Sequence, residues 1–330
     1  MPTVPAGVRG AAITGWGTAL PDQVVTNHDL ERTLDTNHDW IVERTGIVER
    51  RIGGSTAGLS VEAGRQAIER AGLQPGDIDA LVLATTTPDR AVPGTSSTVQ
   101  HQLGLTCGAY DLNAACSGWV YGLVNAHGLV ALGAEKVLVI GTDTLARITD
   151  LDDRNTAILF ADGSGAAVIE AIDGPGQLLS WHLSADGSAE DALYAEVGGK
   201  LQMEGREVFR RAVRIMVDSA TVSMHAAGVT ADEIALVVPH QANIRIISAS
   251  CERLGIDLDR ASIVLDRTGN TSAASIPLAL ADALERGRIC EGDLVLFVGF
   301  GAGMTAASAV VRWSAAVPQP ASTDRRGGRR

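Results

Sequence analysis

The run Lys136-Val-Leu-Val-Ile-Gly141 returns later in the chain as Asp293-Leu-Val-Leu-Phe-Val-Gly299, and this recurrence decides the fold. Both runs are rich in apolar and β-branched residues, as in strands that a sheet buries on both faces. Ala80–Ala84 and Ile234–Val238 have the same character. Stretches with helical periodicity separate the four runs, and this alternation is typical of an α/β fold with parallel strands.

Three other segments recur in the same order. Ala71-Gly-Leu with Asp77-Ile returns as Ala227-Gly-Val with Glu233-Ile, Leu103-Gly-Leu returns as Leu254-Gly-Ile, and Asp162-Gly-Ser-Gly-Ala-Ala-Val-Ile169 is echoed by 301–311. The offsets lie between 151 residues, from Leu103 to Leu254, and 158, from Gly141 to Gly299. A period this long indicates a duplicated domain, because solenoid repeats span only about 20 to 50 residues.

The duplication predicts two α/β halves packed about a pseudo-twofold axis. Their boundary is expected near Gly174-Pro-Gly176, so that the halves are residues 1–173 and 174–317. Residues 318–330 are rich in Pro, Ser, Gly and Arg, which predicts a disordered tail. The total of 330 residues is a suitable length for two domain-sized units.

The composition is that of a globular protein, with 45% hydrophobic and 20% charged residues. Its cysteines show neither CxxC nor metal-ligand spacing, and its N-terminus does not resemble a signal peptide. No apolar run reaches the roughly 18 residues that a membrane span needs. We therefore expect a reduced, soluble, cytoplasmic protein with no metal and no membrane contact. The formal charge of -12 argues against nucleic acid as a partner.

A lone cysteine stands out in the stretch Asp111-Leu-Asn-Ala-Ala-Cys-Ser-Gly-Trp119, just before a predicted helix. A free cysteine is often only a buried packing residue, but a helix N-terminus also stabilises the thiolate of a nucleophile. Position alone leaves both interpretations of Cys116 open. In the second half, Asn270 occupies the equivalent zone, and the strand ending at Val238 delivers His240. Sites in α/β sheets form at the carboxyl ends of strands, so we expect these three side chains to converge.

Several motifs, taken in order, resemble β-ketoacyl-acyl carrier protein synthase III, the initiating condensing enzyme of bacterial fatty-acid synthesis. They are Asn113-Ala-Ala-Cys116-Ser-Gly, Pro239-His240-Gln-Ala-Asn243-Ile-Arg245-Ile-Ile, Gly269-Asn270-Thr-Ser-Ala-Ala-Ser, Gly299-Phe-Gly301-Ala-Gly303, Asp39-Trp40-Ile-Val-Glu-Arg44-Thr-Gly46, Asp153-Arg154 and Phe160-Ala-Asp-Gly163. The resemblance spans residues 10 to 313. It implies the thiolase fold, with a layered α-β-α-β-α core, in a homodimer that needs no cofactor.

The resemblance also implies the reaction and the residues that carry it. An acyl-CoA primer would condense with malonyl-acyl carrier protein to give 3-oxoacyl-acyl carrier protein, CO2 and CoA. Cys116 would be the nucleophile, and its backbone N–H with that of Ala302 would form the oxyanion hole. His240 and Asn270 would donate hydrogen bonds to the enolate that malonyl decarboxylation leaves.

Binding residues are carried over in the same way. Trp40 and Arg154 match residues that sandwich the CoA adenine, and others along the CoA tunnel match Thr36, Arg44, Gly205 and Asn243. Arg245, with Arg210 and Arg214 on a predicted helix, would bind the acidic carrier protein, although such a stripe is often only a solvated face. Val92 would reach across the dimer interface to close the acyl pocket, which Leu159 and Phe209 also line.

Three related classes of enzyme are compared with this reading. A thiolase would carry a second catalytic cysteine in the loop at Gly299–Gly303, which has none, and an elongating ketosynthase would carry a histidine at Asn270. A relative that primes a polyketide, or transfers an acyl group without decarboxylation, stays open as the alternative. The intact Cys-His-Asn set argues against a non-catalytic partner subunit.

Overall fold

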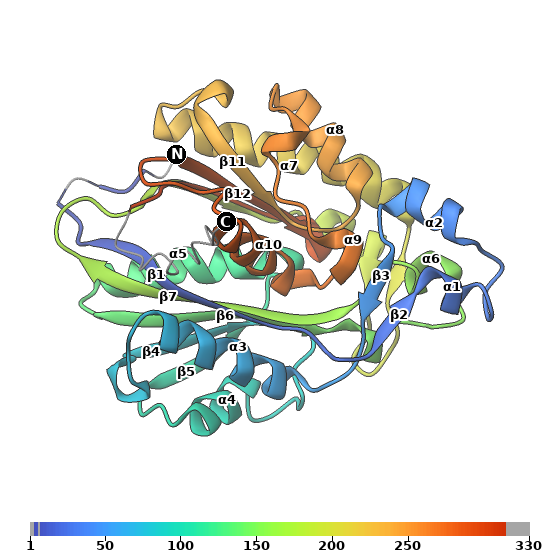
Figure 1. Ribbon diagram of the computed structural model, residues 1–330, viewed down its shortest axis with the longest axis horizontal. Helices are drawn as coiled ribbons and strands as arrows, with labels where there is room; N and C mark the ends of the chain where they lie inside the picture. The colour runs from blue at the N-terminus through green and yellow to red at the C-terminus, as the bar shows by residue number, and fades with distance from the viewer. Residues whose placement is uncertain (1–2, 6, 315–330) are drawn as a thin grey trace, which may run out of the picture.

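The computed structural model describes residues 3–5 and 7–314, in which two sheets alternate with three layers of helices (Figure 1). The first sheet has the order β1-β7-β6-β4-β5 and the second β11-β12-β13-β8. Their strands are β1 (Gly10–Ala19), β4 (Ala80–Ala84), β5 (Gly108–Leu112), β6 (Lys136–Thr144), β7 (Asp162–Ile172), β8 (Leu178–Ser184), β11 (Ile234–Pro239), β12 (Leu294–Gly301) and β13 (Thr305–Arg312).

Helices cover both outer faces and fill the space between the sheets. The outer layer on the first sheet contains α3 (Thr56–Arg70) and α4 (Thr95–Leu103), and that on the second contains α7 (Gly205–Ala227) and α8 (Ile244–Leu254). The central layer contains α5 (Gly118–Ala131) and α10 (Ser275–Glu285), which contact strands of both sheets. The predicted α-β-α-β-α core is therefore confirmed (Figure 1).

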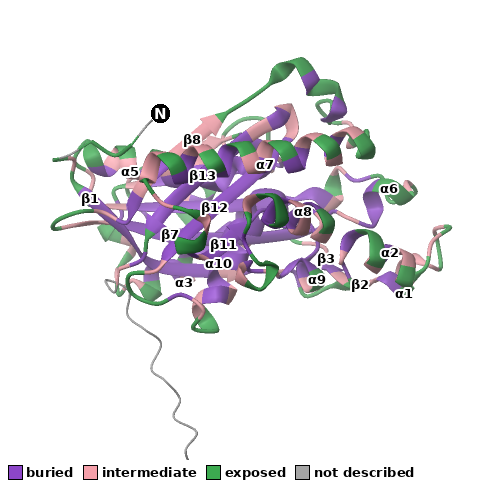
Figure 2. Ribbon diagram, turned by 90° about the horizontal axis from the view of Figure 1, so that it is seen from above, coloured by how far each residue is buried: buried purple, intermediate pink, exposed green. Residues whose placement is uncertain are grey.

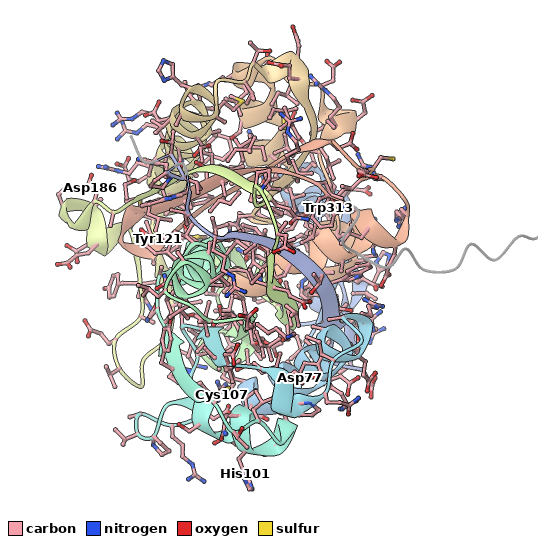
Figure 3. The ribbon with its side chains drawn as sticks, turned by 90° about the vertical axis from the view of Figure 1, so that its left-hand side faces the viewer. Asp77, His101, Cys107, Tyr121, Asp186 and Trp313 are labelled. Carbon is pink, nitrogen blue, oxygen red and sulfur yellow. The ribbon has the colours of Figure 1, made fainter. Side chains whose placement is uncertain are left out.

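Sequence character explains which helix takes which layer. Helix α7 has a buried stripe facing the second sheet and an exposed outer stripe (Figure 2), as an amphipathic surface helix does. Helices α5 and α10 are apolar around most of their circumference, and such helices are buried. Trp119 on α5 packs edge-on against Phe297 of β12, with ring centroids 5.4 Å apart. Tyr121 lies below the segment that carries Asp186, and its hydroxyl donates a hydrogen bond of 2.9 Å to the carbonyl of Ser184 (Figure 3).

The second sheet repeats the strand order of the first. Strands β8, β13, β12 and β11 correspond to β1, β7, β6 and β4, with the same parallel and antiparallel pairing. The counterpart of β5 is reduced to a single parallel bridge between Val237 and Ala261. In the first sheet β5 is a full strand at the edge, where it is partly exposed along its length.

The smaller elements lie at one end of the molecule, where α1, α2 and α6 cluster beside β2 and β3 (Figure 1). They are β2 (Val24–Thr26), α1 (Asn27–Leu30), α2 (His38–Thr45), β3 (Glu49–Arg51), α6 (Arg154–Ala157), β9 (Leu193–Tyr194), β10 (Gln202–Met203) and α9 (Leu265–Thr268). Single helical turns complete the chain: η1 (Pro75–Asp77), η2 (Ala115–Ser117), η3 (Leu145–Arg147), η4 (Gly187–Ala192), η5 (Ala231–Glu233), η6 (Leu258–Arg260), η7 (Ser272–Ala274) and η8 (Ala302–Met304).

The predicted strands are present, and three of them run further than expected. Strand β4 has the predicted bounds, whereas β6 continues to Thr144, β11 to Pro239 and β12 to Gly301. Gly174-Pro-Gly176 lies in the connection between β7 and β8, and the domain boundary there stays a prediction. The predicted tail, 318–330, lies outside the described residues. No helix in the described part of the chain combines the length and apolar character needed to cross a bilayer.

Candidate active site

Cys116 lies in the tight turn η2, which leads directly into the central helix α5. Ala115 takes the left-handed conformation, with φ at 48°, and the side-chain oxygen of Asn113 accepts a hydrogen bond of 3.2 Å from its N–H. A non-glycine residue in that region is strained. The turn therefore holds Cys116 in one orientation, buried with 9% of its surface exposed, at the N-terminus of a helix.

The second half forms the same turn in front of the other central helix. In η7, Ser272 has φ at 51°, and the side-chain oxygen of Asn270 accepts a hydrogen bond of 3.0 Å from its N–H. Turn η7 leads into α10 and contacts η2. The structural counterpart of Asn270 in the first half is therefore Asn113, which stands 157 residues earlier in the chain (270 minus 113).

Strand β12 approaches the backbone of Cys116 closely. A Cβ placed on Gly301 would lie 2.6 Å from the amide nitrogen of Cys116, so any side chain at Gly301 would push the turn away. Ala302, the next residue, lines the same cavity as Cys116. The two predicted oxyanion-hole residues are thus brought together at the end of β12.

His240 reaches the same region from the end of β11. Its N–H donates a hydrogen bond of 2.8 Å to the carbonyl of Val298, and its ring packs edge-on against Phe300 at 5.5 Å. The ring nitrogen Nδ1 is 2.7 Å from the hydroxyl oxygen of Ser275, the first residue of α10. The imidazole is thus fixed by contacts to both β12 and α10, with 1% of the residue exposed.

Burial, more than charge, sets the protonation of these groups. Burial raises the pKa of the Cys116 thiol to about 12, a hydrogen bond from Ser272 lowers it, and the charge of Asp143 raises it. Burial lowers the pKa of His240 to about 3. The free protein at neutral pH therefore holds a thiol and a neutral imidazole, whereas the sequence had suggested that a helix N-terminus and an imidazole would favour the thiolate.

A cavity of about 460 Å³ opens beside Cys116. Its lining comes from both halves and from the segment that contains β9 and β10: Thr86, Asn113, Ala114, Ala115, Cys116, Leu145, Ile148, Phe160, Glu190, Leu193, Tyr194, Ala195, Leu201, Ser272, Ala302, Gly303 and Thr305. Three predicted acyl-pocket residues are not among them. Leu159 packs in a small cluster with Ile47, Phe209 lies on α7 and packs against the core of the second half, and Val92 is 84% exposed in the single chain.

Most of the predicted CoA residues form one group at the end of the molecule near α2 and α6. The guanidinium groups of Arg44 and Arg154 lie 4.8 and 4.9 Å from the ring centroid of Trp40. Arg154 also donates a hydrogen bond of 2.8 Å to the carbonyl of Asp35, next to Thr36. The amide of Asn243 donates to the carbonyl of Arg44 at 2.9 Å and caps α8. Gly205 begins α7, directly after the segment of β10 that contacts α6.

The predicted carrier-binding arginines differ in their surroundings. Arg210 donates three hydrogen bonds to Glu207, at 2.7, 2.8 and 3.1 Å, and Arg214 lies 3.7 Å from Asp218. Arg245 lies over the ring of Phe209 at 5.4 Å and has no carboxylate within ion-pair distance among the described residues. Within the described part of the chain, Arg245 therefore carries a free positive charge on this face, whereas Arg210 and Arg214 on α7 lie beside carboxylates.

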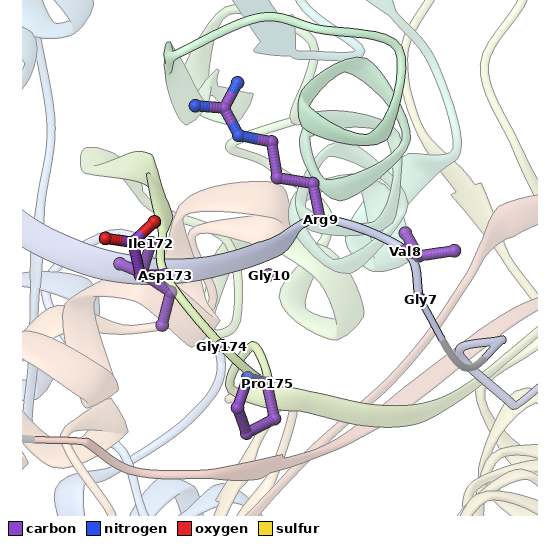
Figure 4. Close-up of a pocket in the computed structure, with 8 residues that line it drawn as sticks. All are labelled: Gly7, Val8, Arg9, Gly10, Ile172, Asp173, Gly174 and Pro175. Atoms are coloured by element: carbon purple, nitrogen blue, oxygen red, sulfur yellow. The ribbon is translucent and has the colours of Figure 1, made fainter.

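A second hollow, of about 450 Å³, lies where the start of β1 meets the end of β7 (Figure 4). Its lining is Gly7, Val8, Arg9, Gly10, Ile172, Asp173, Gly174 and Pro175, and none of the predicted catalytic or binding residues is among them. Arg9 extends away to Glu135, with which it forms an ion pair of 2.6 Å. In residues 3–5 and 7–314 no group of three His, Cys, Asp or Glu side chains is arranged to hold a metal.

Several residues at the site went unnoticed in the sequence. Ser272 lies within a motif that was noted for Asn270. Thr86 stands two residues after the predicted strand Ala80–Ala84, so the strand-end rule could have found it. Leu193 and Leu201 reach the cavity from an irregular segment. Nothing in their local sequence marks them.

A duplicated, layered fold with a cysteine at the N-terminus of a central helix defines the class: a thiolase-fold acyltransferase of the condensing type. The model of 3-oxoacyl-[acyl-carrier-protein (ACP)] synthase III matches residues 110–187, and the model of its C-terminal part matches residues 224–313. The β-ketoacyl-[acyl-carrier-protein] synthase III of Roseiflexus castenholzii is 49% identical over 325 residues, covering 92% of this chain and 98% of that one. The chain belongs to the β-ketoacyl-[acyl-carrier-protein] synthase III family.

Other relatives agree. The synthase III 1 of Bacillus anthracis is 45% identical over 306 residues, covering 91% of this chain and 98% of that protein. The crystal structure of 3-oxoacyl-[acyl-carrier-protein] synthase III from Aquifex aeolicus superposes with a TM-score of 0.91 at 41% identity, covering 92% and 100% of the two chains. The priming β-ketosynthase of the R1128 polyketide pathway has a TM-score of 0.89 at 34% identity, with 94% and 98% covered.

The buried neutral His240 predicts a loss of stability in acid. In the unfolded chain this histidine binds a proton near its ordinary pKa of 6.5, but the folded protein resists protonation down to about pH 3. The contribution of His240 to the free energy of unfolding is therefore fully present above pH 6.5. As the pH drops below that value, this contribution falls by up to about 1.4 kcal/mol per pH unit. Urea unfolding at pH 7 and pH 5 should show a loss from this residue of about 2 kcal/mol.

The variant His240→Gln removes the titrating group, so its unfolding free energy should depend less on pH than that of the wild type. His101→Gln, at an exposed histidine (Figure 3), is the control and should keep the wild-type dependence. An unchanged pH dependence in His240→Gln would show that this imidazole is not held neutral.

Proposed function

We propose that this enzyme condenses an acyl-CoA primer with malonyl-acyl carrier protein, releasing CO2 and CoA and giving 3-oxoacyl-acyl carrier protein. The observation that carries the proposal is the contact between the two turns at the N-termini of the central helices. Turn η2 contains Cys116, and turn η7 follows shortly after Asn270. His240 is fixed beside them by Ser275 and Phe300. We further propose a cytoplasmic homodimer that needs no cofactor or metal.

In the first half-reaction, Cys116 attacks the thioester carbonyl of acyl-CoA. Because the thiol is protonated in the free protein, it must lose its proton as it attacks, and the N-terminus of α5 then stabilises the negative sulfur. The oxyanion is stabilised by the backbone N–H groups of Cys116 and Ala302. CoA leaves, and the acyl group remains on Cys116.

In the second half-reaction, His240 and Asn270 stabilise the enolate that forms when malonyl-acyl carrier protein loses CO2. The side-chain oxygen of Asn270 accepts a hydrogen bond from the N–H of Ser272. The side-chain NH2 group of Asn270 is therefore the donor to the enolate. Nδ1 of His240 faces the hydroxyl of Ser275, so when that hydroxyl donates, Nε2 carries the proton and is the second donor. The enolate carbon then attacks the carbonyl carbon of the acyl group, the thioester bond to Cys116 breaks, and the sulfur leaves as a thiolate that takes up a proton to restore the thiol.

We propose that the group formed by Thr36, Trp40, Arg44 and Arg154 binds the nucleotide end of CoA, with Gly205 and Asn243 along the path to the cavity. Stacking of the adenine on Trp40 would place it where the two guanidinium groups now lie. Arginine suits this position because it can stack on a ring and pair with phosphate.

A second candidate function is the priming of a polyketide, or acyl transfer without decarboxylation. The structural similarity to the priming β-ketosynthase of a polyketide pathway favours this candidate. Both candidates use the same cysteine, and they differ in the primer and in the fate of the malonyl group.

Separating the two half-reactions tests the proposed roles. Mass measurement of the intact protein after mixing with acetyl-CoA should show one added acetyl group in the wild type, His240→Ala and Asn270→Ala, and none in Cys116→Ala. Release of CO2 from malonyl-acyl carrier protein should fall about 100-fold in His240→Ala and in Asn270→Ala, because each removes a donor to the enolate.

His101→Ala, at an exposed histidine, serves as the control for both measurements. An acyl adduct that persists in Cys116→Ala would remove the proposed nucleophile. Equal losses of acylation and CO2 release in His240→Ala and Asn270→Ala would show that the proposed division of roles is wrong.

The carrier protein is proposed to bind at Arg245, with Arg210 and Arg214 in support. Because Glu207 already pairs with Arg210, while Arg245 has no such carboxylate, Arg245→Ala should raise the KM for malonyl-acyl carrier protein several-fold more than Arg210→Ala does. The KM for acyl-CoA should change little, and the effect should shrink as salt screens the charge. Parallel increases for both substrates would place Arg245 outside the carrier site.

The acyl pocket is proposed to include Val92 of the partner subunit, with Leu159 and Phe209 behind the cavity wall. Valine leaves more room than a large aromatic residue, and each buried CH2 contributes about 0.8 kcal/mol. We therefore expect kcat/KM for isobutyryl-CoA to equal or exceed that for acetyl-CoA, and Val92→Phe to reverse this order.

Leu132→Phe, at a residue that is 86% exposed, is the matched control and should leave the order unchanged. If Val92→Phe also leaves the order of primers unchanged, Val92 does not close the acyl pocket.

A further inference from the structure

Asp143 is a fully buried carboxylate at the carboxyl end of β6. One of its oxygens accepts hydrogen bonds from the hydroxyl of Thr85 at 3.1 Å, from the N–H and hydroxyl of Thr86 at 2.7 and 2.9 Å, and from the hydroxyl of Thr87 at 2.9 Å. Its other oxygen accepts from the N–H of Ala273 at 3.1 Å. Among the described residues, no lysine, arginine or histidine lies within ion-pair distance of it.

These partners belong to the two opposite halves of the molecule. Thr85, Thr86 and Thr87 follow β4 in the first half, and Thr86 lines the cavity beside Cys116. Ala273 is the middle residue of η7 in the second half, 130 residues further along the chain than Asp143. One carboxylate therefore joins the wall of the cavity to the turn that follows Asn270.

A buried charge is costly unless hydrogen bonds compensate for it. Here all the donors that the described residues supply are neutral, and the carboxylate has no opposite charge to attract. Because Asp143 has no ion-pair partner in the described part of the chain, attraction to an opposite charge does not stabilise it. Its role is therefore to fix the positions of the groups that donate hydrogen bonds to it.

The corresponding position in the second half shows what the carboxylate replaces. Gly299 follows Gly141 by 158 residues, and the same offset pairs Asp143 with Gly301. At Gly301 the strand end meets η2 directly, with a Cβ position 2.6 Å from the nitrogen of Cys116. Strand β6 also approaches the backbone of η7, since a Cβ placed on Gly141 would lie 2.4 Å from the carbonyl oxygen of Ala273, and Asp143 adds a side-chain contact. At these strand ends the turn with Cys116 is thus fixed by backbone contact, and the turn after Asn270 by backbone contact and a carboxylate.

We propose that Asp143 is a positioning residue that holds η7, and with it Asn270 and Ser272, against the cavity wall at Thr86. Its loss mainly impairs the decarboxylation of the malonyl group, the step for which Asn270 is proposed. Cys116 keeps its own turn and its reactivity, because Gly301 still fixes η2. This inference rests on the proposed division of the two half-reactions.

The negative charge gives Asp143 a second, opposite effect. It adds to burial in raising the pKa of Cys116. Removing the charge while keeping the shape, as in Asp143→Asn, therefore makes the thiol easier to ionise. A residue that acted only as structural support would not move the reactivity of the thiol and the decarboxylation rate in opposite directions.

The test compares Asp143→Asn with the wild type in two assays. Release of CO2 from malonyl-acyl carrier protein should fall about tenfold to a hundredfold, since small misplacements of positioning groups have effects of this size. Alkylation of Cys116 by iodoacetamide should be no slower, with its pH profile shifted to lower pH. Losses of similar size in both assays, or no loss of CO2 release, would overturn the inference.

Asp162→Asn is the matched control, because Asp162 is also a buried carboxylate and accepts from the N–H groups of Gly53 at 2.7 Å and Ala146 at 2.8 Å, outside η7. This variant should not lower CO2 release while leaving the alkylation of Cys116 intact. Where Asp143→Asn does not fold, Thr85→Val removes one donor to the carboxylate but keeps its charge, so CO2 release should fall by a smaller factor while alkylation of Cys116 stays unchanged. A wild type that is acylated but releases no CO2 overturns the proposed function together with the inference, whereas equal losses in an otherwise active system overturn the inference alone.

Discussion

The contact between the end of β12 and the backbone of Cys116 is the constraint on which the rest of the site depends. It requires glycine at position 301, and it requires the two sheets to close onto the central layer until the second half touches the turn of the first. The central helices permit that closure because α5 and α10 are apolar nearly all round and bury against both sheets. Their N-termini then meet, one carrying a thiol and the other preceded by an amide.

The three proposed reacting side chains of the resulting site, Cys116, His240 and Asn270, carry no formal charge in the free protein. Burial keeps the thiol protonated and the imidazole neutral, and the amide of Asn270 cannot ionise. Catalysis in such a site depends on where donors point, because oriented dipoles act strongly when water is excluded. This explains why so many hydrogen bonds around it orient side chains, including those of Ser275 to His240 and of Ser272 to Asn270.

Much of the frame could be predicted from the sequence, because it depends on local patterns. The bounds of β4, the duplicated order of elements and the arrival of Cys116 and His240 at strand ends all follow from periodicity and spacing. The equivalence of Asn113 and Asn270 was also readable, since each stands three residues before the middle of a turn, although Asn270 was expected in the zone equivalent to Cys116.

Other features depend on contacts between distant segments, and no local pattern reveals them. The left-handed conformation at Ala115 and Ser272 arises in residues that rarely adopt it, and only the packing of the two turns enforces it. The bond between Asp143 and Ala273 spans 130 residues. Burial of the thiol likewise reversed the expected direction of its pKa, because a helix terminus can be read from sequence but the surrounding desolvation cannot.

The two halves differ at one pair of equivalent sheet edges. In the first sheet β5 is a full strand that is partly exposed along its length, whereas in the second its counterpart is reduced to one bridge beside β11, which is buried almost throughout. An exposed edge strand offers unpaired N–H and C=O groups to another strand. Of these two equivalent edges in the described residues, the first therefore offers a full strand for pairing, and the duplicated halves are not interchangeable as surfaces.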